Sequence, residues 1–463
     1  MLFSVPKSLA FLLATCSMVG PLSANTYMPG LGMIAEEFGV GEVAAYQTLS
    51  SYLICFATSS LFVGAVSDSL GRRAVMIGGL LCYALSCAIC AFSPDYETFL
   101  IGRILMGLFA STGTVLAMAV TRDLFSGRQA QELTSLIAVI FALAPALAPI
   151  IGGWLVSLFG WRSVFYFLSI FACTMALICF FLLKETHPKE LRTSFHFVPL
   201  VKQYALSMKN VAFTAGVICS GFVFMGSILF SAGAPDYVEN IMGMGVTDFG
   251  YLMIPLIGFS VTGSIFCTKI TERFGEERTM KMQIAVMYVA GILGVVLNYF
   301  WHVPYPFCLF AVIVYSTAMS VVRPILTVYN LDYFPQNRGM AASIQQFFQT
   351  SSFAICAALW VPVVMGSAWK YDLVLLFCGV MVSVTWLIVL KTRPRCLPKI
   401  SHHRIVKSVE TMTTLQATDS ELRLAAIDGL HLAFMQKIRP TTGTGAQAMR
   451  ARIFRISYGK GNR

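Results

Sequence analysis

Charged residues are scarce in this sequence. Asp, Glu, Lys and Arg make up 12% of its 463 residues, whereas soluble globular proteins carry about 25%. Apolar residues make up 57%, and the mean hydropathy is +0.73. Apolar runs long enough to cross a bilayer as a helix repeat along most of the chain. These features exclude a soluble globular protein and predict an all-α polytopic membrane protein.

The sequence also lacks the patterns that mark catalytic and cofactor sites. It has no nucleotide-binding loop, no arrangement of nucleophile and base, and no Cys or His spacing typical of a metal site. Twelve of the thirteen cysteines lie in or at the ends of apolar runs, where we interpret them as packing residues. We therefore expect no enzyme activity, no cofactor, no metal and no nucleic-acid partner.

The apolar runs predict twelve membrane spans in two groups of six. This arrangement is typical of two structural repeats. The predicted domains are an N-terminal six-helix bundle (1–183), a cytoplasmic linker (184–210), a C-terminal six-helix bundle (211–392) and a basic cytoplasmic tail (393–463). The predicted spans lie at 9–33, 45–66, 74–92, 98–120, 134–158, 162–183, 211–234, 249–268, 280–300, 305–329, 341–365 and 371–390.

The distribution of basic residues predicts the orientation. With the N-terminus inside, cytoplasmic segments up to Arg395 hold eighteen Lys and Arg, and the outer loops hold two, Arg162 and Lys370. Both termini are therefore predicted to be cytoplasmic. Residues 396–463 carry eleven Lys and Arg against four Asp and Glu. This segment is either a loosely ordered tail or a helix on the anionic inner leaflet, beginning at the capping box Thr418-Asp-Ser-Glu421.

A short polar loop separates the second and third predicted spans. Its ten residues are Gly-Ala-Val-Ser-Asp-Ser-Leu-Gly-Arg-Arg, and the residues that matter are Gly64, Asp68, Gly71, Arg72 and Arg73. A span cannot continue through an Asp, two Arg and a Gly turn, so the segment forms a loop at the bilayer surface.

This loop resembles the signature loop of the major facilitator superfamily, a family of transporters built from two six-helix bundles. In that family the Asp charges a helix end and the arginines tie neighbouring helices together on the cytoplasmic side. A weaker copy at 268–278, after the eighth predicted span, supports an internal repeat. The resemblance implies a central cavity that opens alternately to each side, and a loop that latches the cytoplasmic face. Energy would come from an ion or solute gradient, because no ATP-binding loop is present.

The fifth predicted span carries a second family motif. It contains Pro145, Pro149, Gly152 and Gly153. These residues look like the antiporter motif of drug exporters, although they would also serve an ordinary packing kink. Together with Pro21 to Pro29 in span one and Arg122-Asp123-Leu-Phe125 after span four, they resemble the Bcr/CflA group of bacterial multidrug exporters.

Two arginines lie within the predicted spans. An Arg at the centre of a membrane helix costs about 2.5–3.5 kcal/mol, so each must face a cavity or a partner. Arg103, with Gly107 one turn later, is similar to the Arg-x-x-x-Gly element of span four, which the family associates with proton transfer and substrate binding. Arg103 could instead extend to the outer interface, and Arg323 could pair at the interface with Asp332 or with a helix C-terminus. The predicted substrate cavity comprises Tyr27, Tyr52, Gly107 and Arg323.

One position departs from the Bcr/CflA pattern. That group generally has an Asp, its proton carrier, where Asn25 stands, and an Asn cannot titrate. All Asp and Glu of the sequence lie in loops, at span ends or in the tail. The remaining carboxyl candidate is Asp236, at the outer end of span seven, whose plainer interpretation is a solvated loop acid. The predicted transport and coupling residues are Asn25, Arg103 and Asp236.

The resemblance implies a monomeric secondary transporter that exports small amphipathic compounds across a bacterial inner membrane by proton antiport. The expected partners are a small-molecule substrate, protons and the lipid bilayer. Two alternatives remain open. Asn25 and the two arginines would suit a facilitator or exporter of metabolites, amino acids or organic anions without proton coupling. A sensor or scaffold with the transporter fold could instead signal through the C-terminal tail.

Overall fold

The computed structural model describes residues 7–125, 127–192, 194, 196–243, 248–301, 307–334 and 337–392. They belong to one compact unit, Met1–Arg393. Their regular secondary structure is helical, with no strand among these residues. The predicted basic tail at 393–463, including its capping box, lies outside the described residues.

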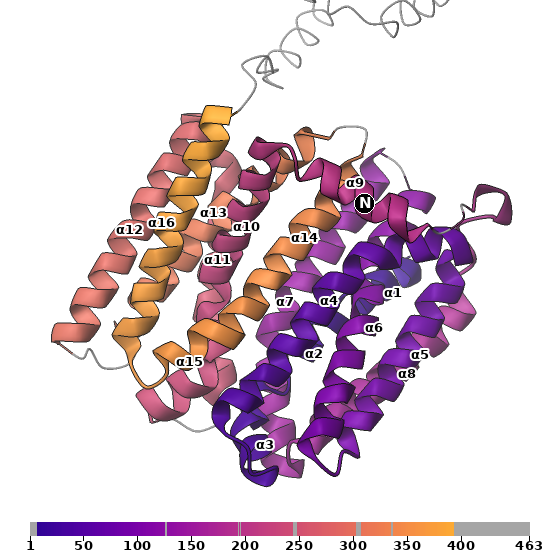
Figure 1. Ribbon diagram of the computed structural model, residues 1–463, viewed down its shortest axis with the longest axis horizontal. Coiled ribbons are helices and arrows are strands. Elements are labelled where there is room, and N and C mark those ends of the chain that lie inside the picture. Colours follow the sequence, from indigo (N-terminus) through magenta and orange to yellow (C-terminus); the bar gives the residue numbers. More distant parts are fainter. Residues whose placement is uncertain are drawn as a thin grey trace, which may run out of the picture. The chain divides into compact units, whose positions relative to one another are not determined.

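The first half contains one broken span followed by long helices (Figure 1). The broken span begins with α1 (Lys7–Ser17) and α2 (Val19–Asn25) and ends with the 3₁₀ turn η1 (Met28–Gly30) and α3 (Leu31–Glu37). Pro29 lies at the start of η1, where its missing N–H costs no hydrogen bond. The long helices are α4 (Glu42–Leu70), α5 (Arg72–Ala91), α6 (Tyr96–Leu124), α7 (Gly127–Phe159) and α8 (Arg162–Leu182).

The second half repeats the pattern of long helices (Figure 1). It comprises α10 (Val211–Asp236) with the π-turn η3 (Tyr237–Ile241), α11 (Asp248–Phe274), α12 (Glu276–Phe300), η4 (Phe307–Leu309), α13 (Phe310–Asp332), α14 (Arg338–Ile355), η5 (Cys356–Trp360), α15 (Val361–Val364) and α16 (Ala368–Thr392). One further helix, α9 (Phe197–Ser207), lies in the predicted linker. The sequence interpretation had treated 184–210 only as a polar connection, because the apolar residues of α9 are too few for a span.

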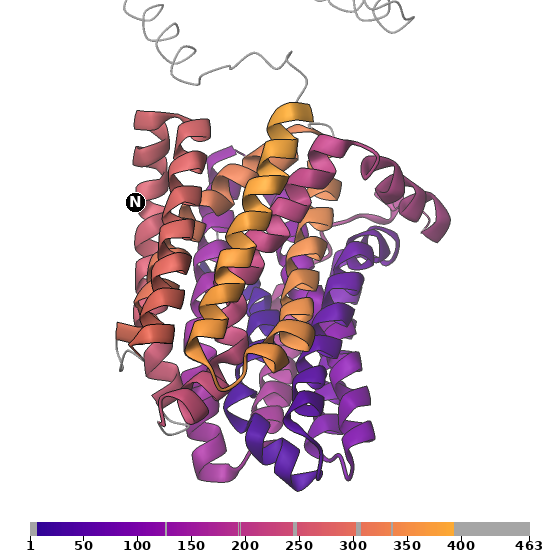
Figure 2. The ribbon, with the colours of Figure 1, turned by 60° about the vertical axis from the view of Figure 1, so that its left-hand side comes forward.

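Ten helical segments of the described residues are long and apolar enough to cross a membrane, and each overlaps a predicted span. The long helices α7 and α11 overlap the predicted fifth and eighth spans and are not among these ten. The long helices run side by side in both views (Figures 1 and 2). An all-α polytopic membrane protein is therefore confirmed, with about ten spanning helices.

Local hydrogen bonds fix where the helices start. The side chain of Asp95 caps α6 and accepts a bond from the backbone N–H of Thr98 at 2.8 Å. This bond to the Thr98 backbone lowers the pKa of Asp95, because it favours the ionised carboxyl. The cap holds the first turn of α6, the helix that carries Arg103.

Small residues allow the helices of the first half to pack closely. A Cβ on Gly152 of α7 would lie 1.9 Å from the backbone oxygen of Thr26, and a Cβ on Gly107 of α6 would lie 2.3 Å from that of Tyr52. Membrane helices associate through such close backbone contacts, because the hydrophobic effect contributes little to helix association within lipid. Gly152 therefore brings α7 against the break in span one, and Gly107 brings α6 against α4.

We expect Gly152→Ala to destabilise the fold, because the added methyl group collides with backbone rather than with a side chain that can move. Overpacking of this kind costs about 1–3 kcal/mol. Thermal unfolding of the detergent-purified protein measures the effect. The control is Gly78→Ala in α5, where a Cβ would meet nothing within 4 Å. Equal unfolding temperatures for the two variants would contradict the packing role of Gly152.

Candidate functional site

Arg103 lies in an aromatic cage inside the first half. Its side chain has 0% exposure, so the alternative that it extends to the outer interface is wrong. Its guanidinium carbon lies 4.0 Å from the ring centroid of Tyr27, 4.6 Å from that of Tyr52 and 6.0 Å from that of Phe165. A desolvated cation over an aromatic face gains about 2 kcal/mol, so the rings partly replace lost hydration.

The polar partners of Arg103 are few. Nη1 donates to the backbone oxygen of Ser23 at 3.4 Å and approaches Met106 Sδ at 3.9 Å. Nε and Nη2 have no hydrogen-bond partner in the described part of the chain. No ion pair with a carboxylate is found for Arg103 among those residues either. The cage thus holds a buried cation with two nitrogens available for another acceptor.

The tyrosines of the cage are fixed by their hydroxyl groups. Tyr52 donates to the backbone oxygen of Gly20 at 2.9 Å, and the hydroxyls of Tyr27 and Thr48 lie 3.2 Å apart. Both tyrosines have exposures of 1% or less. In this conformation Tyr27, Tyr52 and Gly107 therefore pack the helices around Arg103, and their role in a substrate cavity stays a prediction.

Asn25 lies where the two halves of the chain meet. It is the last residue of α2, it is 2% exposed, and its Nδ2 donates to the backbone oxygen of Pro21 at 2.8 Å. Its Oδ1 accepts a hydrogen bond from Ser231 of α10 at 3.2 Å. The residue that replaces the expected acid thus makes a neutral bond between span one and span seven.

The proposed antiporter motif lies on α7, beside this part of span one. Pro145 and Pro149 are both within the helix, and Pro149, Gly152 and Gly153 are buried. Gly152 contacts the backbone of Thr26, which follows Asn25. Gly152 therefore sets the distance between α7 and the segment that carries Asn25 and Tyr27.

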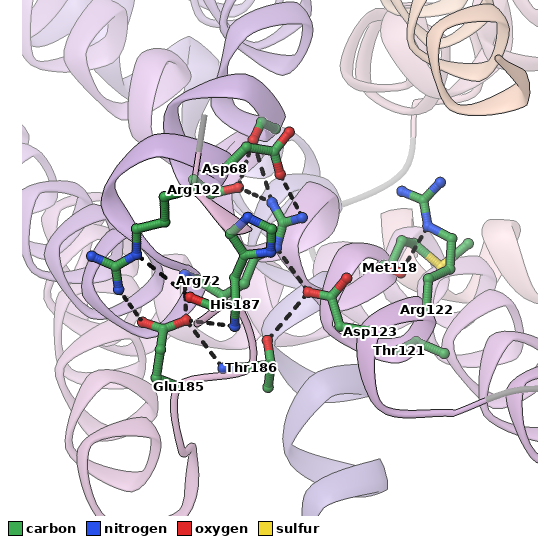
Figure 3. Close-up of polar contacts among 12 residues, drawn as sticks. Asp68, Arg72, Met118, Thr121, Arg122, Asp123, Glu185, Thr186, His187 and Arg192 are labelled. Carbon is green, nitrogen blue, oxygen red and sulfur yellow. Dashed lines mark hydrogen bonds and ion pairs between the residues drawn. The ribbon is translucent and has the colours of Figure 1, made fainter. Parts of the chain in front are cut away.

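The polar loop after α4 forms a network of ion pairs (Figure 3). Gly71 joins α4 to α5 with φ +102°, a left-handed conformation that favours glycine. Arg72 pairs with Asp68 at 2.5 Å and, through Nε, with Asp123 of α6 at 3.0 Å; it also donates to Ser67. Its side chain is mostly buried. Arg72 thus connects the ends of α4, α5 and α6, as the family resemblance implied.

The segment after α8 joins the same network (Figure 3). Glu185 accepts hydrogen bonds from the backbone N–H groups of Arg72 at 2.9 Å, Thr186 at 3.0 Å and His187 at 3.0 Å. Arg192 pairs with Glu185 at 3.5 Å. The neighbouring Arg73 donates to the backbone oxygen of Phe180 in α8 at 2.7 Å. The loop therefore holds the start of the linker against the ends of α4, α5 and α8.

Asp236 lies at the opposite end of the molecule and is buried. Its exposure is 3%, so the interpretation as a solvated loop acid is wrong. Its oxygens accept hydrogen bonds from the backbone N–H of Gly366 at 3.1 and 3.0 Å and from the Tyr371 hydroxyl at 3.0 Å. Gly366, with φ +74°, belongs to the connection between α15 and α16.

A surface pocket beside Asp236 lies between the two halves. One side comes from α3 and α4 and the other from α10 and the connection after α15. The lining residues are Leu31, Gly32, Glu42, Ala45, Tyr46, Pro235, Asp236 and Met365. Asp236 is thus buried among protein groups but lines a pocket that opens to the surface.

Arg323, the second arginine within the spans, is exposed on α13. Its guanidinium carbon lies 5.3 Å from the ring centroid of Phe224 in α10. Asp332 pairs instead with Arg338 at 3.1 Å, so the predicted alternative pairing with Asp332 is not found. The structure does not bring Arg323 and Arg103 into one cluster of contacts.

Comparisons with known proteins agree with this arrangement. A sequence model of the Major Facilitator Superfamily matches residues 13–357. The chain belongs to the major facilitator superfamily. A protein of Haemophilus influenzae named bicyclomycin resistance protein homolog is 30% identical over 281 residues, which cover 60% of this chain and 70% of that protein. The multidrug resistance protein MdtL of Escherichia coli O157:H7 is 26% identical over 385 residues, covering 83% of this chain and 96% of MdtL.

The fold is also that of solved transporters. The D-xylose-proton symporter aligns with a TM-score of 0.66 at 17% identity, covering 84% of this chain and 98% of that one. The family-model match and the relatives named for bicyclomycin and multidrug resistance confirm the resemblance to Bcr/CflA-like members of the superfamily. This major facilitator protein is a multi-pass membrane protein of the bacterial inner membrane.

One buried acid was missed by the sequence interpretation. Asp372, the fifth residue of α16, has 0% exposure. Asn298 of α12 donates from Nδ2 to its Oδ2 at 2.6 Å, and Oδ1 has no partner among the described residues. A Cβ on Gly294 would lie 2.6 Å from its carboxyl carbon. No local pattern marks Asp372, because an acid at a span end is usually solvated.

We expect Arg72→Gln to destabilise the protein more than Arg73→Gln does. Arg72 is mostly buried between two carboxylates, whereas Arg73 bonds a backbone oxygen. Removing one partner of a buried pair costs about 3–5 kcal/mol, which we reduce to about 1–3 kcal/mol because Asp68 and Asp123 are partly exposed. Unfolding in detergent measures both variants. The role of Arg72 would be contradicted by a larger loss in Arg73→Gln.

Proposed function

We propose that this transporter exports small amphipathic compounds by alternating access, in exchange for protons that enter through Asp236. The names of its relatives, which refer to bicyclomycin resistance and multidrug resistance, support a drug-like cargo. We also propose twelve spans in two six-helix bundles, both termini in the cytoplasm, and a monomer. The basic bias of the predicted cytoplasmic segments supports this topology.

The hydrogen bonds of Asp236 are the observation that carries the proposal. An ionised carboxylate forms stronger hydrogen bonds than a neutral acid, and each bond to a charged group contributes about 1.5–3 kcal/mol. Ionised Asp236 therefore holds the connection at Gly366 against the outer end of α10. Proton binding removes the charge and weakens these bonds, so a proton from outside favours opening of the outer face.

The same bonds give the direction of coupling. When the outer face closes, the N–H of Gly366 and the hydroxyl of Tyr371 again donate to Asp236. For antiport, Asp236 must release that proton into the cavity while the cavity faces the cytoplasm, so that a proton moves inward as cargo moves outward. Asn25 contributes a neutral contact with Ser231, and the permanent charge of Arg103 stays in its cage.

At the cytoplasmic face, we propose that the network around Arg72 acts as the latch of the closed state. A Cβ on Gly339, at the start of α14, would lie 3.2 Å from Nη1 of Arg122 in α6. The inner ends of α6 and α14 therefore approach each other next to Asp123, which pairs with Arg72. Motion of α14 would therefore shift the end of α6 and disturb the ion pair between Asp123 and Arg72.

We expect Asp236→Asn to abolish drug-dependent proton movement while drug binding persists. The measurement uses everted membrane vesicles acidified by respiration, with a fluorescent pH indicator. Addition of bicyclomycin or ethidium to vesicles with the unaltered protein should release part of the proton gradient. Vesicles with Asp236→Asn should show no release, because the amide cannot take up a proton.

The control variant is Asp332→Asn, which removes an exposed carboxylate paired only with Arg338. It should behave like the unaltered protein. Resistance to bicyclomycin or ethidium without any release of the gradient would contradict proton antiport. Loss of release in Asp332→Asn, but not in Asp236→Asn, would contradict the assignment of Asp236.

A second candidate function is favoured by the arginines. Arg103 has two unpaired guanidinium nitrogens, and Arg323 is exposed with no carboxylate paired to it among the described residues. Cations without neutralising acids attract anionic or zwitterionic cargo. This observation supports a facilitator or exporter of organic anions or amino acids, which would need no proton coupling.

We expect Arg323→Gln to discriminate between these cargo classes. If the cargo is anionic, the variant should lose transport of an anionic dye such as fluorescein, because the attracting charge is gone. Transport of the cationic dye ethidium should be unchanged or faster. Dye efflux from cells measures both, with the exposed Arg338→Gln as control. Equal loss of both dyes would contradict a charge-selecting role for Arg323.

A further inference from the structure

The helix α9 exposes an apolar surface although it lies outside the candidate spans. Val198 is 73% exposed, Phe197 and Leu206 are each 53% exposed, and Val201 is 39% exposed. At 3.6 residues per turn, Val198, Val201 and Ala205 fall within a sector of about 60°. Phe197 borders this sector on one side and Lys202 on the other. Such a surface in water would be unfavourable, so a partner covers it.

The attachment of α9 places it at the level of the membrane boundary. The Tyr204 hydroxyl donates to the backbone oxygen of Leu61 in α4 at 2.8 Å, and the ring of Phe197 stacks on Phe62 at 5.2 Å. Burial raises the pKa of the Tyr204 hydroxyl, in agreement with its direction toward α4. Figures 1 and 2 show α9 running across the long helices rather than along them.

The depth of this attachment follows from the geometry of α4. A helix of 29 residues is about 43 Å long, close to the thickness of a bilayer with its headgroups. Leu61 lies roughly 14 Å from the cytoplasmic end of α4 at Leu70. The contact with α9 is therefore below the charged helix ends, where headgroups meet acyl chains.

The charge around α9 matches an anionic surface. The segment 184–210 contains five Lys and Arg and two Glu. One of the two acids, Glu185, already pairs with Arg192. Lys189, Lys202 and Lys209 are exposed. Basic side chains near the inner leaflet gain about 1 kcal/mol each from anionic lipids.

We propose that α9 is an interfacial anchor that docks on the anionic phospholipids of the inner leaflet. Val198 and Val201 enter the boundary between headgroups and acyl chains, and Lys202 extends to a lipid phosphate. The connection between the halves is thereby held in the membrane surface. This inference depends on the inner-membrane location and not on proton antiport.

A photo-crosslinking residue tests the proposal in the full-length protein. We replace Val198 with p-benzoylphenylalanine and irradiate native membranes, with Gln203 on another side of α9 as the matched control position. Position 198 should give phospholipid adducts by mass spectrometry, and position 203 should give several-fold fewer. Adducts at 198 to residues 394–463 or to another protein, or no lipid adduct there, would overturn the proposal.

Reconstituted vesicles test the charge component. We compare the position-198 adduct yield in phosphatidylcholine vesicles with that in vesicles of phosphatidylcholine and phosphatidylglycerol. The yield should rise with phosphatidylglycerol, and Lys202→Gln should reduce that rise. A yield independent of lipid charge would overturn the selection of anionic lipids. The substituted side chains are exposed, so the test does not perturb the packed core.

Discussion

The contact of Arg103 with aromatic rings is the constraint on which the first half depends. A guanidinium with no exposed surface must recover the hydration that it loses, and here Tyr27 and Tyr52 supply most of that compensation. Span one is broken between Asn25 and Leu31, and Tyr27 within this break lies against the Arg103 guanidinium. Gly152 and Gly107 must lack side chains so that α7 and α6 close around the cage. The cage around Arg103 therefore depends both on the break in span one and on the two glycines.

The two ends of the molecule differ in how their polar contacts respond to a proton. At one end, Arg72 contacts both Asp68 and Asp123, so two carboxylates share its charge. At the other end, the single carboxyl of Asp236 accepts hydrogen bonds from Gly366 and Tyr371, and Tyr371 also donates to the backbone oxygen of Gly233. In the proposed mechanism, one proton on Asp236 weakens that contact. This asymmetry supports coupling at the outer end even though span one has Asn25.

Much of the fold could be predicted from the sequence because its signals are local. Apolar runs predicted the membrane helices, and the Gly, Asp and Arg pattern predicted the turn at Gly71 with its ion pairs. The burial of Asp236 could not be predicted, because its donors come from Gly366 and Tyr371, more than 100 residues away in the chain. The helix α9 was missed because an interfacial helix has too few apolar residues for a span.

Asp372 shows the same limit and adds a constraint on the mechanism. It is buried beside Asn298 with no cation paired to it among the described residues, whereas Arg103 is buried with no acid. Burying either side chain in its charged form without a partner would cost several kcal/mol of folding free energy. Neither side chain therefore stabilises the fold in the way that a paired charge can. The buried base and the buried acid thus lie in different halves of the chain. The hydrogen bond from Ser231 to Asn25 joins these two halves.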